Sequence, residues 1–393
     1  MEAARYVEVR EDVFIRTKNV DRRGVYEMKL RDAIKDAVFS TPSANDTEVK
    51  PAEKPKPLFR FVTPGGSESI GYWRIGMPYV GVHKLGFYGV ITNQIPSPNE
   101  LLAMDKTENA QTMAVVTHLT YMRGTLDKLN ALWRAGVPLI VDVDDYIWAW
   151  GRLTASQLKE FNRTLEIATV VTTTTEYLQK KIREHAGVSA VILPNTMPEE
   201  EFRPPIARTP DERLRVIYTG GITHETEWGM IREMVDATAS FADWIIFHGQ
   251  QLDKTGRFQQ LVTPAPLIGA QNILWQIPQQ PQVFLRTAYN TRPHVSVAPL
   301  AYTKMNTAKS DLKILEAGAL GIPCVTQKDS EPYKNWPLKG NTVNDFVGWL
   351  ELFNEDEELR SKWGERTVDY AWERRLQGEQ YMAALLEAYS GIR

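Results

Sequence analysis

Short apolar runs alternate with longer amphipathic segments along the chain from residue 58 onward. The short runs fit buried strands, and the longer segments, apolar at every third or fourth position, fit helices. In the first half we expect strands at 58–62, 88–92, 113–117, 139–143, 170–174 and 191–193, and helices at 79–85, 126–135, 155–167 and 175–185. This alternation is typical of βα units built around a parallel sheet.

The second half of the chain repeats the pattern. Strands are expected at 213–218, 244–247, 273–276, 294–297 and 324–326, and helices at 226–241, 282–289, 311–320, 344–352 and 355–370. The stretch 194–205 is rich in proline and turn-forming residues and divides the two halves. We therefore predict an α/β chain of two facing, doubly wound domains, with ligands bound where the carboxyl ends of the strands border a cleft.

Composition sets the outer boundaries of these domains. Residues 1–57 carry many charges of both signs, one helix-like piece near 25–38 and a polar, Pro-rich linker over 40–57. We expect domains at 58–197 and 198–371. The last part of the chain, 372–393, is expected to contain one helix at about 372–389, in which Trp372, Tyr381, Leu385 and Tyr389 are spaced for packing.

The overall composition is that of an ordinary globular protein. Of 393 residues, 43% are hydrophobic and 24% charged, and the net charge of −3 gives no general basic surface for nucleic acid, although a local basic cleft stays open. No apolar run approaches the ~18 residues of a membrane span, and the start of the chain does not resemble a signal peptide. We expect a cytoplasmic protein (host cytoplasm if viral), with its single Cys324 as a small buried hydrophobe.

The segment 306–325 carries the clearest chemistry. Lys309 and Ser310 lie in a loop that runs into a helix bearing Lys313 and Glu316. Cationic and N–H donors at a helix N-terminus suit an anion such as a diphosphate, and a carboxylate further along can accept hydrogen bonds from ribose hydroxyls. The alternative is that Lys313 and Glu316, three residues apart, form a surface pair.

Two glycine-bearing loops follow predicted strands. In 218–227, Gly220 and Gly221 would let the backbone approach a ligand, Thr223 could cap the next helix, and His224 is a further ligand-binding candidate. The alternative is an ordinary Gly-rich βα turn. The loop is neither G-x-G-x-x-G nor a Walker sequence, which disfavours a dinucleotide oxidoreductase or an NTPase.

The earlier loop, 63–74, contains Gly65, Gly66 and Arg74. The glycines would again permit close approach, and Arg74 would supply a fixed cation with a planar donor fork. Tyr72 and Trp73 fit either an acceptor platform or core aromatics.

Polar residues also follow two buried strands of the first half. Asp144 and Asp145 come after strand 139–143, and His118 follows strand 113–117. Binding of an acceptor hydroxyl, or a role as base, suits these carboxylates, while helix capping or a metal site are alternatives. His118 would orient an acceptor hydroxyl or be a polar loop residue.

The segments 306–325 and 139–148 resemble GT-B glycosyltransferases, in particular the retaining, family-four-like group, and the resemblance extends over about 58–390. It implies two facing Rossmann-like domains, an acceptor domain then a donor domain, with a C-terminal crossover helix packing back on the first. It implies transfer of a sugar from a UDP- or GDP-sugar to an acceptor hydroxyl with retention, without a metal or prosthetic group. The implied catalytic residues are His118, Asp144 and Asp145, and the implied donor-binding residues are Gly65, Gly66, Arg74, Gly220, Gly221, Thr223, His224, Lys309, Ser310, Lys313 and Glu316.

The chain departs from that family's pattern at two places. Many retaining members have a glutamate eight residues before the second one, where this chain has Ala308, and the loop 218–227 has neither the Arg nor the Lys common there. Neutralising the diphosphate would then fall to Lys309, Lys304 or Arg74. Three alternatives stay open: an acceptor base in viral DNA, a sugar-nucleotide epimerase, and a non-catalytic nucleotide-sugar binding protein.

Overall fold

The computed structural model describes residues 55–63, 71–118, 125–151, 153–209, 212–220, 226–248, 267, 269–276, 281–390 and 392. The chain divides into two units, 1–53 and 54–393, and all described residues belong to the second. The expected helix near 25–38 and the candidates Gly65, Gly66, Gly221, Thr223 and His224 therefore lie outside the described residues.

Within the described residues, the first sheet has six parallel strands in the order β2-β1-β3-β4-β5-β6. Its strands are β1 (Lys56–Val62), β2 (Tyr88–Thr92), β3 (Ala110–His118), β4 (Leu139–Val143), β5 (Val170–Thr173) and β6 (Val191–Ile192). Every residue of β4 is buried, as expected for a continuous apolar run covered on both faces.

The helices of this first lobe are η1 (Tyr72–Gly76), α2 (Met77–Lys84), α3 (Pro98–Glu108), α4 (Thr125–Arg134), η2 (Ile147–Ala149), α5 (Ala155–Ile167) and α6 (Glu176–Ala186). Side chains alternate between the two sheet faces: Ala114 and Val116 join the core under α2, and Val115 joins the core under α4 and α5. Helix α3 was not predicted. It begins with a capping box between Ser97 and Glu100, but among its residues, all described, only Leu101 is buried, so no apolar stripe marks it.

The second sheet, again counted over the described residues, has six parallel strands in the order β12-β11-β10-β7-β8-β9. Its strands are β7 (Leu214–Gly220), β8 (Ala242–His248), β9 (Ile273–Gln276), β10 (Val295–Ala298), β11 (Cys324–Gln327) and β12 (Lys339–Gly340). Cys324 is buried, which confirms its prediction, and burial raises the pKa of its thiol to about 12. The predicted fold class, two doubly wound α/β domains, is confirmed.

The helices of the second lobe are η3 (Glu199–Glu201), α7 (Trp228–Ala237), α8 (Pro281–Asn290), α9 (Lys304–Thr307), α10 (Leu312–Ala319), η5 (Glu331–Tyr333), α11 (Val343–Glu355) and α12 (Glu357–Glu373). Helix α7 begins at Trp228 with Glu227 at its N-cap position, so the prediction that Thr223 caps it is wrong. The helix starts two residues later than the expected position 226.

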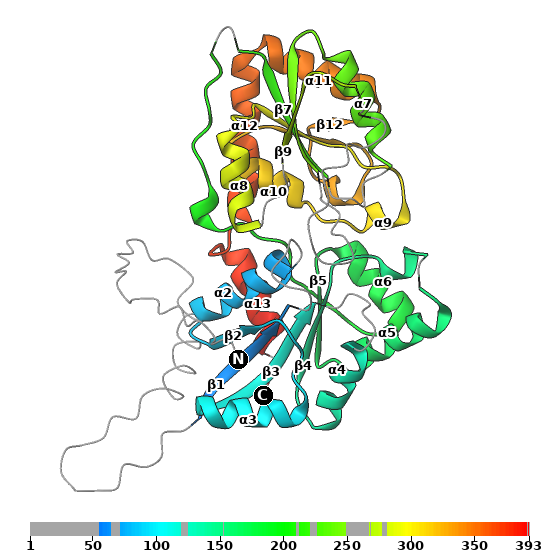
Figure 1. Cartoon of the computed structure of the whole chain (residues 1–393), viewed down its shortest axis with the longest axis vertical. Helices are drawn as coiled ribbons and strands as arrows, with labels where there is room; N and C mark the ends of the chain where they lie inside the picture. The colour runs from blue at the N-terminus through cyan, green and yellow to red at the C-terminus, as the bar shows by residue number, and fades with distance from the viewer. Residues whose placement is uncertain are drawn as a thin grey trace, which may run out of the picture. The chain divides into compact units, whose positions relative to one another are not determined.

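The predicted single helix over 372–389 is also wrong. Helix α12 continues to Glu373, and a separate helix α13 (Glu379–Ser390) follows. Between them the chain crosses to the first lobe, where the Arg374 carbonyl accepts a hydrogen bond from the Thr196 hydroxyl at 2.6 Å. Helix α13 packs against α2, β5 and β6 (Figure 1), and the Tyr389 ring lies 5.2 Å from that of Phe59.

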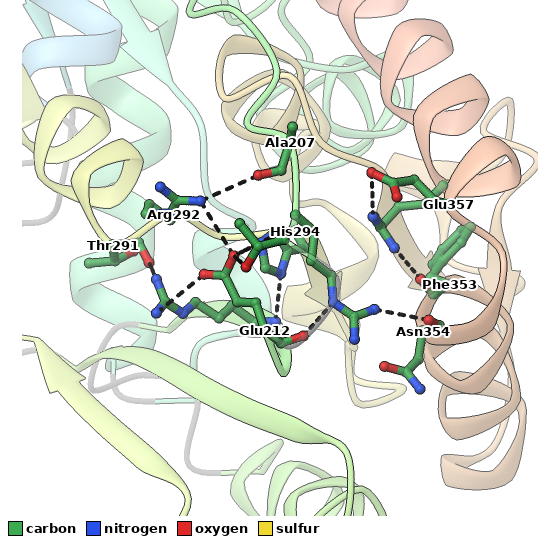
Figure 2. Close-up of polar contacts among 12 residues, drawn as sticks. Ala207, Glu212, Thr291, Arg292, His294, Phe353, Asn354 and Glu357 are labelled. Atoms are coloured by element: carbon green, nitrogen blue, oxygen red, sulfur yellow. Dashed lines mark hydrogen bonds and ion pairs between the residues drawn. The ribbon is translucent and has the colours of Figure 1, made fainter.

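A polar cluster around the buried His294 lies at the amino ends of β7 and β10, the edge opposite to the one where ligands bind in such sheets. His294 Nδ1 accepts a hydrogen bond from the backbone N–H of Arg215 at 3.0 Å. Figure 2 shows Arg292 reaching both the Ala207 carbonyl and the Glu212 carboxylate beside His294. The cluster ties the segment that enters the second lobe to its sheet.

Candidate functional site

His118 and Asp144 form a close pair at the carboxyl ends of β3 and β4. His118 ends β3 directly opposite Asp142 of β4, and its Nε2 lies 2.6 Å from Asp144 Oδ1. Burial opposes protonation of the imidazole, but the charge of Asp144 and its hydrogen bond outweigh burial and raise the pKa of His118. Burial likewise opposes ionisation of Asp144, yet His118, Lys309 and Arg74 hold its pKa well below the usual range.

Arg74 is buried and bonded to groups of its own lobe. Its Nε and Nη2 donate to the two oxygens of Asp142 at 2.9 and 2.5 Å, and Nη1 donates to the Leu193 carbonyl and to Asn195 Oδ1. Burial disfavours the charge, but Asp142 outweighs it and raises the pKa of the guanidinium. Arg74 therefore neutralises the charge of Asp142 and holds the Asn195 side chain in place. It also lines the pocket described below.

Lys309 and Ser310, the expected diphosphate contacts, both bond to residues of the first lobe. Lys309 Nζ lies 2.7 Å from Asp145 Oδ1, and the Ser310 hydroxyl accepts a hydrogen bond from Asn195 Nδ2 at 2.6 Å. Burial alone would lower the pKa of Lys309, but Asp145 raises it above the ordinary value. The loop ahead of α10 thus meets the carboxyl ends of the first sheet.

Lys313 and Glu316 pair with each other and with Thr219 at the end of β7. Lys313 Nζ lies 2.9 Å from Glu316 Oε2 and 2.6 Å from the Thr219 hydroxyl, which donates to Glu316 Oε2 at 3.3 Å. The pair seen as an alternative in the sequence is present, but Glu316 is buried. Glu316 and Lys313 are therefore not a solvated surface pair.

Sequence reasoning missed Glu227, the N-cap residue of α7. Its carboxylate is 1% exposed and accepts hydrogen bonds from the Asn306 amide at 2.8 Å, the Ala301 backbone N–H at 3.0 Å and the Thr226 hydroxyl at 2.9 Å. These bonds hold the segment that leads into α9 and then to Lys309. The one available signal was a carboxylate at a helix start, which does not reveal a partner 79 residues away.

A pocket of about 250 Å³ lies where these groups meet. Its polar lining comprises Arg74, Asp144, Asp145 and Asn195 from the first lobe, and Tyr218, Thr219, Lys309, Ser310, Lys313 and Tyr333 from the second. His118 and Glu316 each contact a lining residue: His118 bonds to Asp144, and Glu316 bonds to Lys313. Ligand pockets span roughly 300–1,000 Å³, so this volume is just below the usual range. The paired Lys309 and Asp145 both line it.

The remaining predicted residues take other places. Trp73 is buried and lines the pocket, while Tyr72 packs edge-on against it at 4.9 Å, which makes both rings packing aromatics as well. Gly220 ends β7 under the Tyr218 ring. Lys304 begins α9. Among the described residues, no group of three or more His, Cys, Asp or Glu is arranged to hold a metal ion, and no helix has the length and apolar character needed to cross a membrane.

Comparison with known proteins gives a match in structure alone. No protein-family model matches the chain. No curated protein matches its sequence either. The Anabaena protein Alr3699/HepE, solved in complex with UDP, is similar with a TM-score of 0.54 and 11% identity over 85% of this chain and 99% of that one. The same protein with UDP-glucose gives a TM-score of 0.55 at 12% identity, over 85% and 99%.

A glycosyltransferase from Rickettsia africae is similar to the same degree, with a TM-score of 0.57 and 10% identity over 86% of this chain and 98% of that one. At such identities the likeness concerns the fold. The described chain has the GT-B fold.

Proposed function

We propose that the protein is a glycosyltransferase that moves a sugar from a nucleotide-diphosphate donor to an acceptor hydroxyl. The observation that carries the proposal is the pocket at the carboxyl ends of both sheets, where the Lys313–Glu316 pair of α10 stands beside Lys309 and Ser310. Ligands of doubly wound sheets bind at such edges. HepE, a protein of similar fold, was solved in complex with UDP and with UDP-glucose, and these complexes support this class of ligand.

The second lobe would hold the donor. Lys309, Ser310 and the N-terminus of α10 would bind the diphosphate, because cations and a helix N-terminus both favour negative charge. Glu316, held by Lys313 and Thr219, would accept hydrogen bonds from the ribose. The same donors would stabilise charge that develops on the departing diphosphate, which is usually the largest catalytic contribution.

The first lobe would present the acceptor. Asp144 is held ionised by His118 on one side and lines the pocket, so it would accept a hydrogen bond from the attacking hydroxyl. Asp145 lies next to it, opposite Lys309. We propose transfer with retention, in which the acceptor attacks from the side of the departing diphosphate and needs no strong base. UDP- and GDP-sugars are the donors to test first.

A thermal-shift screen of nucleotide sugars tests donor binding, because a ligand that binds the native state raises the unfolding midpoint. Glu316→Ala should abolish the shift given by the best donor. Glu351→Ala, an exposed glutamate of α11, is the control and should leave the shift intact. An unchanged shift in Glu316→Ala would remove Glu316 from the donor site.

Transfer itself is tested by incubating the best donor with a panel of carbohydrate, small-molecule and DNA acceptors. NMR of the product gives the configuration of the new glycosidic bond. Retention supports the proposed course, and inversion contradicts it. Epimerised nucleotide sugar formed without any acceptor, or donor binding with no product from any acceptor, would contradict the transferase.

A further inference from the structure

Tyr218 lies at the carboxyl end of β7 with its ring directed along the strand. A Cβ built on Gly220 would lie 2.6 Å from the Tyr218 hydroxyl oxygen and 2.8 Å from Cζ. The side chains of residues 218 and 220 lie on the same face of a strand, so the phenol extends over Gly220 toward the strand end. The ring also packs edge-on against Trp228, the first residue of α7, at 5.3 Å.

The hydroxyl of Tyr218 has no hydrogen-bond partner among the described residues, although the side chain is only 3% exposed. A buried hydroxyl left without a partner is costly, and the few such groups in native proteins call for an explanation. Tyr218 also lines the pocket that contains Lys309, Ser310 and Lys313. Burial and the nearby Glu227 carboxylate raise the pKa of the phenol, so at neutral pH it keeps its proton to donate.

We infer that the Tyr218 hydroxyl is a further donor-binding group, which donates a hydrogen bond to a phosphate oxygen of the nucleotide diphosphate. This inference rests on the proposed function and adds one residue to its site. Neither Arg nor Lys is present in 218–227, and a neutral hydroxyl at the end of β7 supplies a donor in that region. Phosphate oxygens accept such bonds strongly because they carry charge.

The same geometry gives Gly220 a different role from the one predicted. Its missing side chain is the space that the Tyr218 phenol occupies, so glycine is needed there to let the hydroxyl reach the strand end. Gly220→Ala would push the ring away, because the contact is with the aromatic ring and not with a flexible tip. This variant should therefore weaken diphosphate binding in the same way as loss of the hydroxyl.

The test compares Tyr218→Phe with the full-length wild-type protein by calorimetry against UDP, GDP, ADP and TDP, continuing with the tightest. Tyr218→Phe removes one unpartnered buried hydroxyl, so the unfolding midpoint should stay or rise, while affinity falls about 10- to 100-fold. Tyr381→Phe is the matched control. Its hydroxyl is also buried and without a partner among the described residues, but it does not line the pocket, so affinity should not change.

Inorganic pyrophosphate and the matching nucleoside separate the parts of the ligand. Ligand-observed NMR should show weaker binding of pyrophosphate to Tyr218→Phe and unchanged binding of the nucleoside. Equal affinity of both proteins for the diphosphate would overturn the inference and leave the proposed function standing. If Tyr218→Phe lost as much affinity for the nucleoside as for the diphosphate, the proposed contact with phosphate would be overturned. If the wild-type protein bound none of the four diphosphates, both the inference and the proposed function would be overturned.

Discussion

Lys309 Nζ lies 2.7 Å from the carboxylate of Asp145, a residue 164 positions earlier that belongs to the other lobe. The proposed diphosphate cation is thus already paired with an anion. A carboxylate and a phosphate both present charged oxygens to an ammonium group, so the two compete for it. Binding of a donor must break this pair or share the cation, because both residues line the pocket where the donor would lie.

Asp145→Asn should therefore strengthen binding of a nucleotide diphosphate. The substitution keeps the size of the side chain but removes the charge that competes for Lys309. Because both groups are partly exposed, the pair is worth about 1 kcal/mol or less, so affinity should rise about two- to five-fold. Calorimetry at two salt concentrations measures this, and the gain should be smaller at high salt.

Lys309→Met is the complementary change and should weaken diphosphate binding. Lys334→Met serves as its control, because Lys334 forms exposed ion pairs with Glu176 and Glu331 and does not line the pocket. Weaker diphosphate binding in Asp145→Asn would show that the carboxylate assists the cation and does not compete with it.

The His118–Asp144 pair makes a prediction about protonation. The raised pKa of His118 contributes stability that is complete below its ordinary value of 6.5 and is lost as the pH rises through the folded value. The lowered pKa of Asp144 contributes stability that is present above 3.8 and is lost as the pH falls through its folded value. The pair therefore stabilises the protein most between about pH 4 and 6.5.

In Asp144→Asn the attraction disappears and burial remains, so the pKa of His118 should fall. An NMR titration of the imidazole protons should give a midpoint above 6.5 in the wild type and a lower one in the variant. His83 of α2 is the internal control, and its midpoint should not move. If the titration midpoint of His118 were the same in both proteins, Asp144 would not control the protonation of His118.

The sequence predicted elements well where one apolar run or stripe defines them. Strand β4 and helix α5 have the predicted bounds, because β4 is buried throughout and α5 has a buried apolar face. Helix α3 and the break between α12 and α13 were missed. A helix with one buried residue has no apolar stripe, and at the break Arg374 and Leu376 bond to Thr196 and Met197, far away in the sequence.

The candidate site was predictable residue by residue but not in its pairings. Local pattern identified Lys309, Asp145 and Glu316 as polar groups beside strand ends. It carried no information on which of them meet, because these contacts join segments far apart in the chain. Glu227 and Tyr218 were missed for the same reason: burial of a polar group is a property of its neighbours.

Gly318 of α10 packs closely against α12. A Cβ there would collide with the Ala371 side chain and lie 2.5 Å from the Thr367 carbonyl oxygen of α12. Backbone cannot move aside as a side-chain tip can, so Gly318→Ala should lower the free energy of unfolding by about 1–3 kcal/mol. Urea denaturation followed by circular dichroism measures it.

Gly348→Ala in α11 is the matched control. An added Cβ there meets no atom within 4 Å of its position among the described residues. Since alanine favours a helix by up to about 1 kcal/mol over glycine, this variant should be as stable as the wild type or more so. Similar losses in both variants would mean that the α10–α12 contact does not require glycine.

The buried His294, in the cluster of Figure 2, should make the stability of the protein depend on pH. Burial is the main cause that lowers its pKa from 6.5 to about 4; Glu212 opposes the shift, and Arg360, Arg208 and Arg215 add to it. The unfolded chain therefore binds more protons between these values, and stability must fall as the pH drops from 6.5 to 4. A shift of this size corresponds to a loss of up to about 3 kcal/mol in the free energy of unfolding.

His294→Asn keeps an acceptor for the Arg215 N–H and removes the titrating group. The free energy of unfolding of this variant, from urea denaturation, should therefore vary less with pH than that of the wild type. The same pH slope in both proteins would contradict a neutral His294 at this position.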